Sequence, residues 1–188
     1  ESMINSAVPT RAEVADVAHA VLSCTDAVML SAESAVGDYP IAVVEAMDRV
    51  CRAAEKNPGN MRSQHRVEEV FERRDEAIAM ATMYVANHMA IKGVIALTES
   101  GATPLWMSRI RTGMPIFACS RSDQTCRKMV LYRGVIPISF DVTKVTRVAI
   151  NDSVMVQLCE LGYVEEGDMV IITKGAHMGA HGGTCTMR

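Results

Sequence analysis

Short apolar runs alternate with longer helical patterns through the second half of this chain, and this alternation limits the fold more than any other feature. Four such runs, typical of buried strands, occupy residues 93–98, 115–119, 134–140 and 168–173. Helical periodicity fills the intervals at residues 102–112, 122–132 and 145–162. Strands that alternate with helices favour right-handed βαβ crossovers. The pattern therefore predicts a three-layer α/β domain with a mainly parallel sheet.

A shorter α/β pattern precedes this domain. Residues 10–13 form a capping box, and the apolar residues behind it recur at helical spacing, which predicts a helix over residues 10–23. A short buried strand is expected at residues 26–31, and Pro40 can open a second helix. Residues 1–57 thus have the helix, strand and helix of half a repeating α/β unit.

The periodicity fades between these two parts. Residues 58–74 mix proline, glycine and asparagine with many charges, a composition typical of a connection between domains. Asp75 can cap a new helix directly afterwards. We therefore expect a first unit over residues 1–57, a linker over residues 58–74 and an α/β domain over residues 75–188.

Composition excludes several classes of protein. The chain has 188 residues, and its hydrophobic content of 49% is enough to bury a core. Its net charge of −3 gives no basic field for nucleic acid, and no apolar run is long enough to span a membrane. The N-terminus shows no signal-peptide pattern, and six scattered cysteines without a CxxC pair fit reduced thiols. We expect a cytoplasmic protein that binds neither nucleic acid nor membrane.

The loop after the strand at residues 93–98 carries hydroxyl groups and a glycine. Its polar positions are Thr98, Ser100, Gly101 and Thr103. Hydroxyls and unhindered backbone N–H groups at a helix N-terminus can bind phosphate, and open α/β sheets place ligands at the carboxyl ends of strands. The residues alone leave two interpretations open, an anion site or a βα turn with hydroxyl caps. Glu99 is compatible with an anion only if its carboxylate points away.

A glycine-rich loop follows the last expected parallel strand. It carries Lys174, His177 and His181, and its glycines let the backbone approach a ligand closely. The two histidines are four residues apart, but outside a helix this spacing does not place them on one face. No further histidine or carboxylate lies close by in the sequence, so we expect no metal site here.

Four blocks of the sequence are similar to one known family. Residues 9–40, PTRAEVADVAHAVLSCTDAVMLSAESAVGDYP, resemble the stretch of pyruvate kinase from its seventh barrel helix through its eighth barrel strand to the next loop. LTESGATP at 97–104, LYRGVIPISF at 131–140 and GGTCTMR at 182–188 resemble the C-terminal regulatory domain of that enzyme, in the same order. The bacterial form regulated by sugar monophosphates and AMP looks most similar.

The resemblance implies that residues 1–57 are the last part of a (β/α)₈ catalytic barrel and that an effector-binding domain follows. The family transfers phosphate from phosphoenolpyruvate to ADP in glycolysis, which gives pyruvate and ATP, and uses Mg²⁺ and K⁺. The residues that hold the phosphate and the metal ions would all lie before Glu1. The chain alone should therefore be inactive and bind no cofactor, because positioned cations stabilise the transition state of this reaction. The implied partners are the remainder of the barrel, a homotetramer, and a sugar monophosphate or AMP.

The resemblance also assigns roles to individual residues. Ser31 matches the serine at the end of the eighth barrel strand, where it would help relay a proton to the enolate of pyruvate, although it could also simply cap the next turn. The effector phosphate loop corresponds to Thr98, Ser100, Gly101 and Thr103, and the later effector loop to Lys174, His177 and His181. Many members have a basic residue where this chain has Ala102. The loss of one charge-assisted contact would weaken phosphate binding by about 1.5–3 kcal/mol.

The working hypothesis is thus the C-terminal part of a pyruvate kinase, which supplies an allosteric phosphometabolite site and subunit contacts. A free-standing phosphometabolite-binding module is the alternative, since residues 75–188 could fold alone. Such a module would leave the strand edge and helix faces of residues 1–57 uncovered, which is a liability. A redox or metal protein that uses the cysteines and histidines is a third interpretation.

Overall fold

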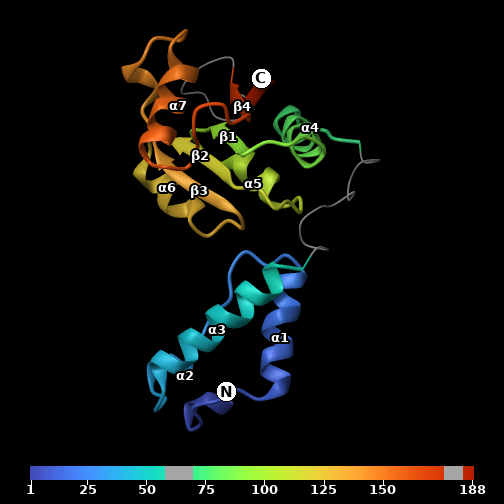
Figure 1. Ribbon diagram of the computed structural model, residues 1–188, viewed down its shortest axis with the longest axis vertical. Coiled ribbons are helices and arrows are strands. Elements are labelled where there is room, and N and C mark those ends of the chain that lie inside the picture. Colours follow the sequence, from blue (N-terminus) through green and yellow to red (C-terminus); the bar gives the residue numbers. More distant parts are fainter. Residues whose placement is uncertain (58–69, 176–183) are drawn as a thin grey trace. The chain divides into compact units, whose positions relative to one another are not determined.

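The computed structural model describes residues 1–57, 70–175 and 184–188, except for the side chain of residue 185. The chain divides into two compact units, Glu1–Met61 and Arg62–Arg188, whose elements are labelled in Figure 1. This division falls inside the predicted linker, most of which lies outside the described residues, so its boundaries stay a prediction. Among the described residues, no helix has both the length and the hydropathy that crossing a membrane requires.

The described part of the first unit is helical. Its elements are the 3₁₀ turn η1 (Ser2–Ile4) and the helices α1 (Arg11–Leu22), α2 (Ala32–Ala35) and α3 (Pro40–Glu55). The predicted capping box opens α1, where Glu13 N–H donates to Thr10 Oγ1 at 3.3 Å and Thr10 N–H donates to Glu13 Oε2 at 2.9 Å. Pro40 is the first residue of α3, as predicted. Both long helices expected in this part of the chain are therefore confirmed.

The strand predicted at residues 26–31 does not form. Leu30 packs against the small core of Met3, Val43 and Ala46, but the side chain of Met29 is 84% exposed. A strand needs a neighbour to accept and donate its backbone hydrogen bonds. The described residues of this unit contain no strand, so residues 26–31 have no such neighbour and stay irregular.

The end of α1 has a cysteine where glycine is usual. Thr25 N–H donates to the Ala20 carbonyl at 3.2 Å and Cys24 N–H to the Val21 carbonyl at 3.0 Å, the two bonds of a Schellman motif. Cys24 has φ +67°, and it is the one non-glycine residue with positive φ in the described part of the chain. A side chain in this left-handed conformation costs about 1 kcal/mol. Backbone hydrogen bonds thus stabilise this turn, although the positive φ of Cys24 is unfavourable for a residue with a side chain.

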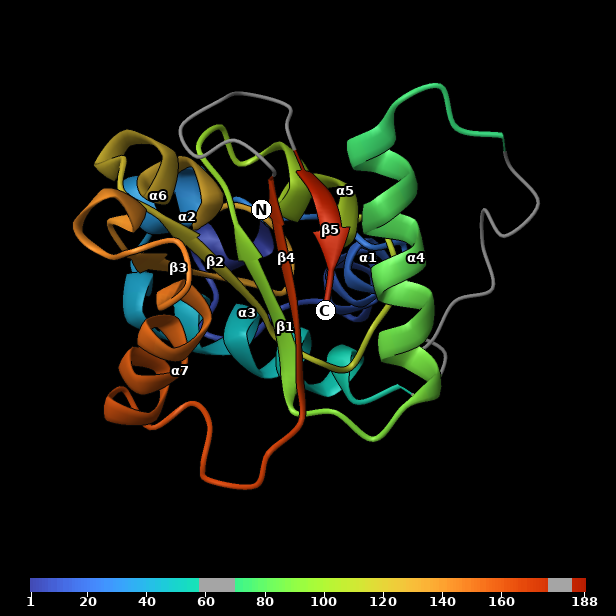
Figure 2. The ribbon, with the colours of Figure 1, turned by 90° about the horizontal axis from the view of Figure 1, so that it is seen from above.

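The second unit is a five-stranded sheet in the order β3-β2-β1-β4-β5. The strands are β1 (Gly93–Leu97), β2 (Ile116–Ser120), β3 (Val135–Ser139), β4 (Val170–Gly175) and β5 (Thr184–Met187). The first four are parallel, and β5 pairs antiparallel with β4. The predicted mainly parallel sheet is confirmed, and the final segment of the chain is an antiparallel edge strand beside α4 (Figure 2).

Helices cover both faces of this sheet. They are α4 (Arg74–His88), α5 (Ala102–Ser108), α6 (Asp123–Met129) and α7 (Ile150–Glu160), with a 3₁₀ turn η3 (Val142–Lys144) before the last. One core packs residues of α4, α5 and α6 against Val94 and Ala96 of β1. The other packs residues of α7 against Ile95 and Leu97 of the same strand. Alternate residues of β1 therefore serve opposite cores, which makes the domain three-layered.

Three helices, α5, α6 and α7, are shorter than the sequence predicts. After α5, the N–H of Arg109 and that of Ile110 donate to carbonyls three residues back, so the last turn tightens and the side chain of Ile110 enters the core. The stretch from residue 145, where a helix was predicted, forms a turn after η3, and α7 itself starts at Ile150. Amphipathic spacing continues through such turns, so it does not locate a helix end.

Helix α4 begins beside an ion pair in which the carboxylate is buried and the guanidinium is exposed. Arg73 is its N-cap, so Asp75 lies within the first turn and not at the cap position that the sequence suggested. Asp75 is 3% exposed and accepts from Arg73 Nε at 3.1 Å and Nη2 at 2.8 Å. These hydrogen bonds from the Arg73 guanidinium lower the pKa of the Asp75 carboxyl. Burial of the carboxyl raises its pKa, but by less, so the net shift is downward.

We expect Asp75→Asn to destabilise the second unit by about 1–2 kcal/mol at pH 7, because it removes a charge-assisted hydrogen-bond pair. The folded-state pKa of Asp75 lies below its unfolded value. The contribution is therefore present above about pH 4 and is lost as the pH falls through the folded-state pKa. Urea unfolding should show a smaller difference in the free energy of unfolding between Asp75→Asn and the unsubstituted chain at pH 3 than at pH 7.

The matched control is Asp152→Asn, because Asp152 also lies in the first turn of a helix, α7, but is exposed. Equal losses in the two variants would contradict a special role for the pair.

Candidate functional site

The order of the strands brings two of the predicted loops to one edge of the sheet. From β1 the chain steps outward to β2 and then β3, and it returns to β4 on the other side of β1. Open α/β sheets bind ligands where the strand order reverses in this way. Ala96 of β1 is paired with Thr173 of β4, so Thr98 and Lys174 both lie at the carboxyl edge of these neighbouring strands.

The loop after β1 is closed by its own hydrogen bonds. Gly101 N–H donates to Thr98 Oγ1 at 3.0 Å, and Ala102 N–H donates to Ser100 Oγ at 3.4 Å. Gly101 has φ +77° and forms the N-cap of α5, a conformation that suits glycine. Because both hydroxyl oxygens accept bonds within the turn, each keeps its own proton to donate to another group.

Thr103 is turned away from this loop. Its side chain is buried, and its hydroxyl shares a hydrogen bond of 2.6 Å with the hydroxyl of Thr184 at the start of β5. The structure thus brings Thr98, Ser100 and Gly101 together in one turn, but it places Thr103 against the sheet.

The carboxylate of Glu99 is held by a cation. Arg121 Nε lies 3.1 Å from both Glu99 oxygens, and the Glu99 side chain is 16% exposed. Thr125 Oγ1 also donates to the Glu99 carbonyl at 2.8 Å. Sequence reasoning missed both partners. The signal for Arg121 was its place directly after β2, since carboxyl ends of neighbouring parallel strands share an edge.

Lys174 lies at the end of β4 and is partly buried. Its Nζ donates to Asn151 Oδ1 on α7 at 3.0 Å. His177 and His181 lie outside the described residues. Within the described ranges, no three histidine, cysteine, aspartate or glutamate side chains are close enough together to hold a metal ion. The expectation that this chain binds no metal stays a prediction.

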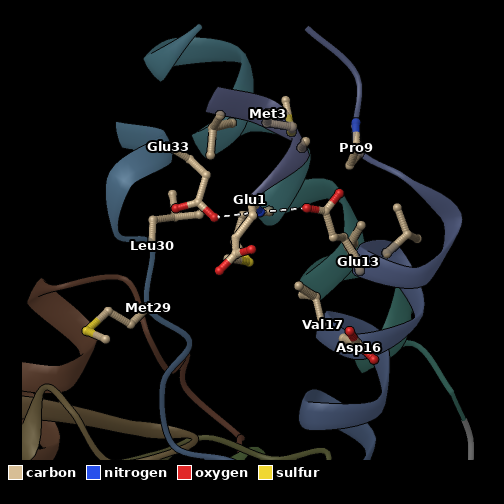
Figure 3. A pocket seen from close by; sticks show the side chains of 14 residues that line it. Glu1, Met3, Pro9, Glu13, Asp16, Val17, Met29, Leu30 and Glu33 are labelled. Carbon is tan, nitrogen blue, oxygen red and sulfur yellow. Dashed lines mark hydrogen bonds and ion pairs between the residues drawn. The ribbon is translucent and has the colours of Figure 1, made fainter. Parts of the chain in front are cut away.

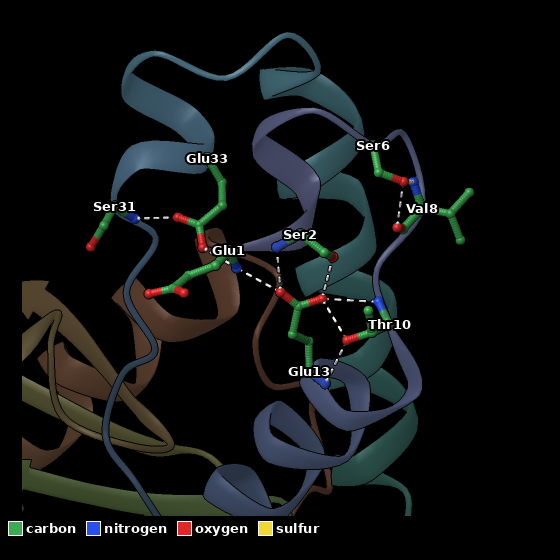
Figure 4. Close-up of polar contacts among 8 residues, drawn as sticks. All are labelled: Glu1, Ser2, Ser6, Val8, Thr10, Glu13, Ser31 and Glu33. Atoms are coloured by element: carbon green, nitrogen blue, oxygen red, sulfur yellow. Dashed lines mark hydrogen bonds and ion pairs between the residues drawn. The ribbon is translucent and has the colours of Figure 1, made fainter.

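Ser31 lies in an exposed loop of the first unit, and its backbone is bonded on both sides. Its N–H donates to Glu33 Oε2 at 3.0 Å (Figure 4). Its carbonyl accepts from the N–H of Ser34 at 3.3 Å and from that of Ala35 at 3.2 Å. The side chain of Ser31 makes no cap bond to α2, and among the described residues its hydroxyl has no hydrogen-bond partner. The hydroxyl is therefore not used as a turn cap.

A pocket in the same unit lies between η1, α1, α3 and residues 29–33 (Figure 3). Its apolar walls include Met3, Val17, Leu30, Val43 and Met47. Glu13 and Glu33 approach the Glu1 nitrogen from opposite sides, at 2.6 Å and 2.9 Å. Backbone N–H groups of Glu33 and Ser31 lower the pKa of the Glu33 carboxyl.

Glu13 is the more heavily bonded of these two carboxylates. It accepts from Ser2 N–H at 2.7 Å, from the Ser2 hydroxyl, from Thr10 N–H at 2.9 Å and from Thr10 Oγ1 at 2.8 Å (Figure 4). These donors of Ser2 and Thr10 lower the pKa of the Glu13 carboxyl. Since the oxygens of Glu13 and Glu33 already accept bonds, these two carboxylates are poor ligands for a metal ion.

Both units match models of one protein family. Residues 76–188 match the model described as "Pyruvate kinase, alpha/beta domain", and residues 1–44 match "Pyruvate kinase, barrel domain". The chain belongs to the pyruvate kinase family. The predicted family and fold class are therefore confirmed, while the roles of individual residues stay predictions.

Several similar pyruvate kinases come from bacteria. The chain is 51% identical to the pyruvate kinase of Buchnera aphidicola subsp. Baizongia pistaciae and to pyruvate kinase II of Salmonella typhimurium, each over 100% of the chain. It is 47% identical to the pyruvate kinase of Haemophilus influenzae over 98% of the chain. In each case the match covers 39% of the relative, so the chain spans about two fifths of the length of these pyruvate kinases.

Gly101 should tolerate a side chain less well than a glycine of similar conformation elsewhere in the chain. A Cβ at Gly101 would lie 3.1 Å from Met129 Cγ, whereas one at Gly162, which has φ +73°, meets nothing within 4 Å. We expect Gly162→Ala to lower stability by about 1 kcal/mol and Gly101→Ala by about 2 kcal/mol. Urea unfolding of the two variants measures the difference. Equal losses would show that Met129 moves aside at no cost.

Proposed function

We propose that this chain is the C-terminal part of a pyruvate kinase, which transfers phosphate from phosphoenolpyruvate to ADP and forms pyruvate and ATP. Membership of the family supports the proposal. The match of residues 1–44 to the barrel model favours it over a free-standing regulatory module, because such a module would not need part of a catalytic barrel. The working enzyme would be a cytoplasmic homotetramer that uses Mg²⁺ and K⁺.

The metal ions of this reaction would be held outside this chain. Mg²⁺ would supply positive charge to the phosphate as it is transferred. The carboxylate nearest to Ser31 in the sequence, Glu33, already accepts the backbone N–H of Ser31, which leaves it poorly suited to a metal. On this proposal, the chain contributes to the chemistry through the Ser31 hydroxyl, and it should be inactive alone.

In the α/β domain, the loop after β1 would bind a phosphorylated metabolite, either a sugar monophosphate or AMP. The observation that carries this proposal is the place of the loop, at the carboxyl edge where the strand order reverses. Thr98 and Ser100 can each donate a hydroxyl proton, Gly101 allows close approach, and the charge of Glu99 is paired with Arg121. Lys174, His177 and His181 would contribute from the second loop.

Thr103 would take part only by a rearrangement. Its hydroxyl is buried against Thr184, so turning it toward a phosphate exchanges one buried hydrogen bond for another. Binding would then bias the orientation of this domain against the barrel and the neighbouring subunits, and so alter the affinity for phosphoenolpyruvate.

The binding proposal is tested by calorimetric titration of the chain with AMP, ribose 5-phosphate, glucose 6-phosphate and fructose 1,6-bisphosphate, with inorganic phosphate as the reference. We expect at least one metabolite to bind more tightly than phosphate itself. If all five bind equally weakly, the loop is a capped turn and not an effector site.

In the full-length enzyme, Ser100→Ala should raise the effector concentration for half-activation about tenfold, because one phosphate contact is lost, while maximal turnover stays nearly unchanged. Adding Thr103→Ala should abolish activation. Ser139→Ala is the matched control, since Ser139 is an exposed hydroxyl residue at the end of the outer strand β3. Steady-state kinetics with and without effector measure both effects. Activation that survives both substitutions would refute the assignment of the site.

A further inference from the structure

The side chain of Lys174 is held by an uncharged partner. Its Nζ donates to Oδ1 of Asn151 at 3.0 Å, and both residues are partly buried. Among the described residues, Lys174 takes part in no ion pair. An amide oxygen can accept a hydrogen bond from an ammonium group, but it carries no net charge. This contact therefore holds the Lys174 ammonium in place without neutralising it.

The backbone of Lys174 is fixed as well. Lys174 is paired with Thr186 in the antiparallel ladder between β4 and β5, and the Thr186 hydroxyl donates to the Lys174 carbonyl at 2.9 Å. The register of this ladder shifts between Lys174 and Gly175. Irregularities of this kind change the direction of the side chains beside them. The Lys174 side chain thus leaves a fixed backbone and ends on a fixed acceptor.

Asn151 is firmly placed by the helix that carries it. It lies in the first turn of α7, and this helix packs against the sheet through the buried residues Ile150, Val154 and Leu158. Helix α7 connects β3 to the parallel strand β4, so it runs back along the sheet and its first turn lies at the carboxyl edge. Asn151 therefore holds Lys174 at the same edge as the loop after β1.

An ammonium group at this position is unfavourable for α7. The first turn of a helix carries partial positive charge, which opposes a nearby cation. Asp152 in the same turn is exposed, and among the described residues it forms no ion pair with Lys174. The stability of the helix therefore does not explain the contact. An anionic ligand at this edge would compensate both the ammonium and the positive end of the helix.

We propose that Asn151 is a positioning residue that holds the Lys174 ammonium where it contacts the phosphate of a bound metabolite. This inference rests on the proposed function, in which Lys174 belongs to the effector site. Thr173 is paired with Ala96, so Lys174 lies beside the last residue of β1, directly before the hydroxyl-bearing turn. Residues 98–103 include no basic residue, so Lys174 would supply a charge that the turn lacks. Asn151 itself would not touch the ligand.

The test compares affinity with stability in the full-length enzyme. The probes are AMP, ribose 5-phosphate and glucose 6-phosphate, and calorimetry gives their dissociation constants. Asn151→Asp keeps an oxygen that accepts from Lys174, but it places a carboxylate on the ammonium. We expect the dissociation constant of the tightest probe to rise about tenfold, because the charge offered to phosphate is neutralised. The midpoint of urea unfolding should not fall, since a carboxylate in the first turn of a helix is favourable.

The matched control is Ser153→Asp, because it adds the same charge to α7 about 200° around the helix from Asn151. We expect it to change the dissociation constant by less than about twofold, since solvent and salt screen a charge that faces away. A merely structural role of Asn151 would give a different result, because Asn151→Asp would then leave binding intact.

A double-mutant cycle tests whether Asn151 acts through Lys174. Asn151→Ala should raise the dissociation constant about threefold, since the ammonium is kept but must be ordered when the ligand binds. In a Lys174→Met background, the same substitution should have no further effect. An effect that persists in this background would show that Asn151 does not act through Lys174, and it would overturn the inference.

Two other results would also overturn it. One is an unchanged dissociation constant in Asn151→Asp, and the other is an equal loss of affinity in Asn151→Asp and Ser153→Asp. The proposed function fails by a different result. If no probe binds the unsubstituted enzyme more tightly than inorganic phosphate does, the effector site itself is refuted, and this inference falls with it.

Discussion

The second unit of the molecule depends on the hydrogen-bond ladders of β1. All five residues of this strand are buried, and parallel ladders join it to β2 on one side and β4 on the other. Because every backbone group of a buried strand must find a partner, β1 fixes the register of both neighbours. Its alternate side chains also belong to opposite cores. The place of the loop after β1 follows from this one strand, since Thr98 begins where its ladder ends.

The first unit is organised by a different kind of contact. Its core is small, with Met3, Val43 and Ala46 at the centre. In this unit, carboxylates that accept hydrogen bonds from backbone N–H groups hold separate segments of the chain together, as the strand ladders do in the second unit. Glu13 closes the capping box of α1 and holds Ser2, and Glu33 holds Ser31. Such bonds are local and directional, so they can fix a loop without burying it.

Regular features could be predicted from the sequence, and long-range contacts could not. The alternation of apolar runs with helical patterns predicted the four strands β1 to β4 along the chain and the three layers, because periodicity depends only on neighbours in the chain. The order of these strands in the sheet was not predicted. The prediction of a strand at residues 26–31 was wrong because a strand needs a neighbouring strand, and the described residues of the first unit contain none. In the candidate site, the turn of Thr98, Ser100 and Gly101 was expected. The pairing of Thr103 with Thr184 joins residues 81 positions apart, and no local pattern signals a contact of that kind.

That threonine pair also joins the helix after β1 to the edge strand of the sheet. Thr184 is the first residue of β5, the edge strand that packs beside α4, and α4 is the first helix after the connection from the barrel unit. A ligand that drew the Thr103 hydroxyl outward would leave the Thr184 hydroxyl without its partner in a dry environment, which favours a shift of β5. Ligand binding at the loop after the central strand β1 would then displace the edge strand β5. Helix α4, which packs beside β5, would be the first helix to move.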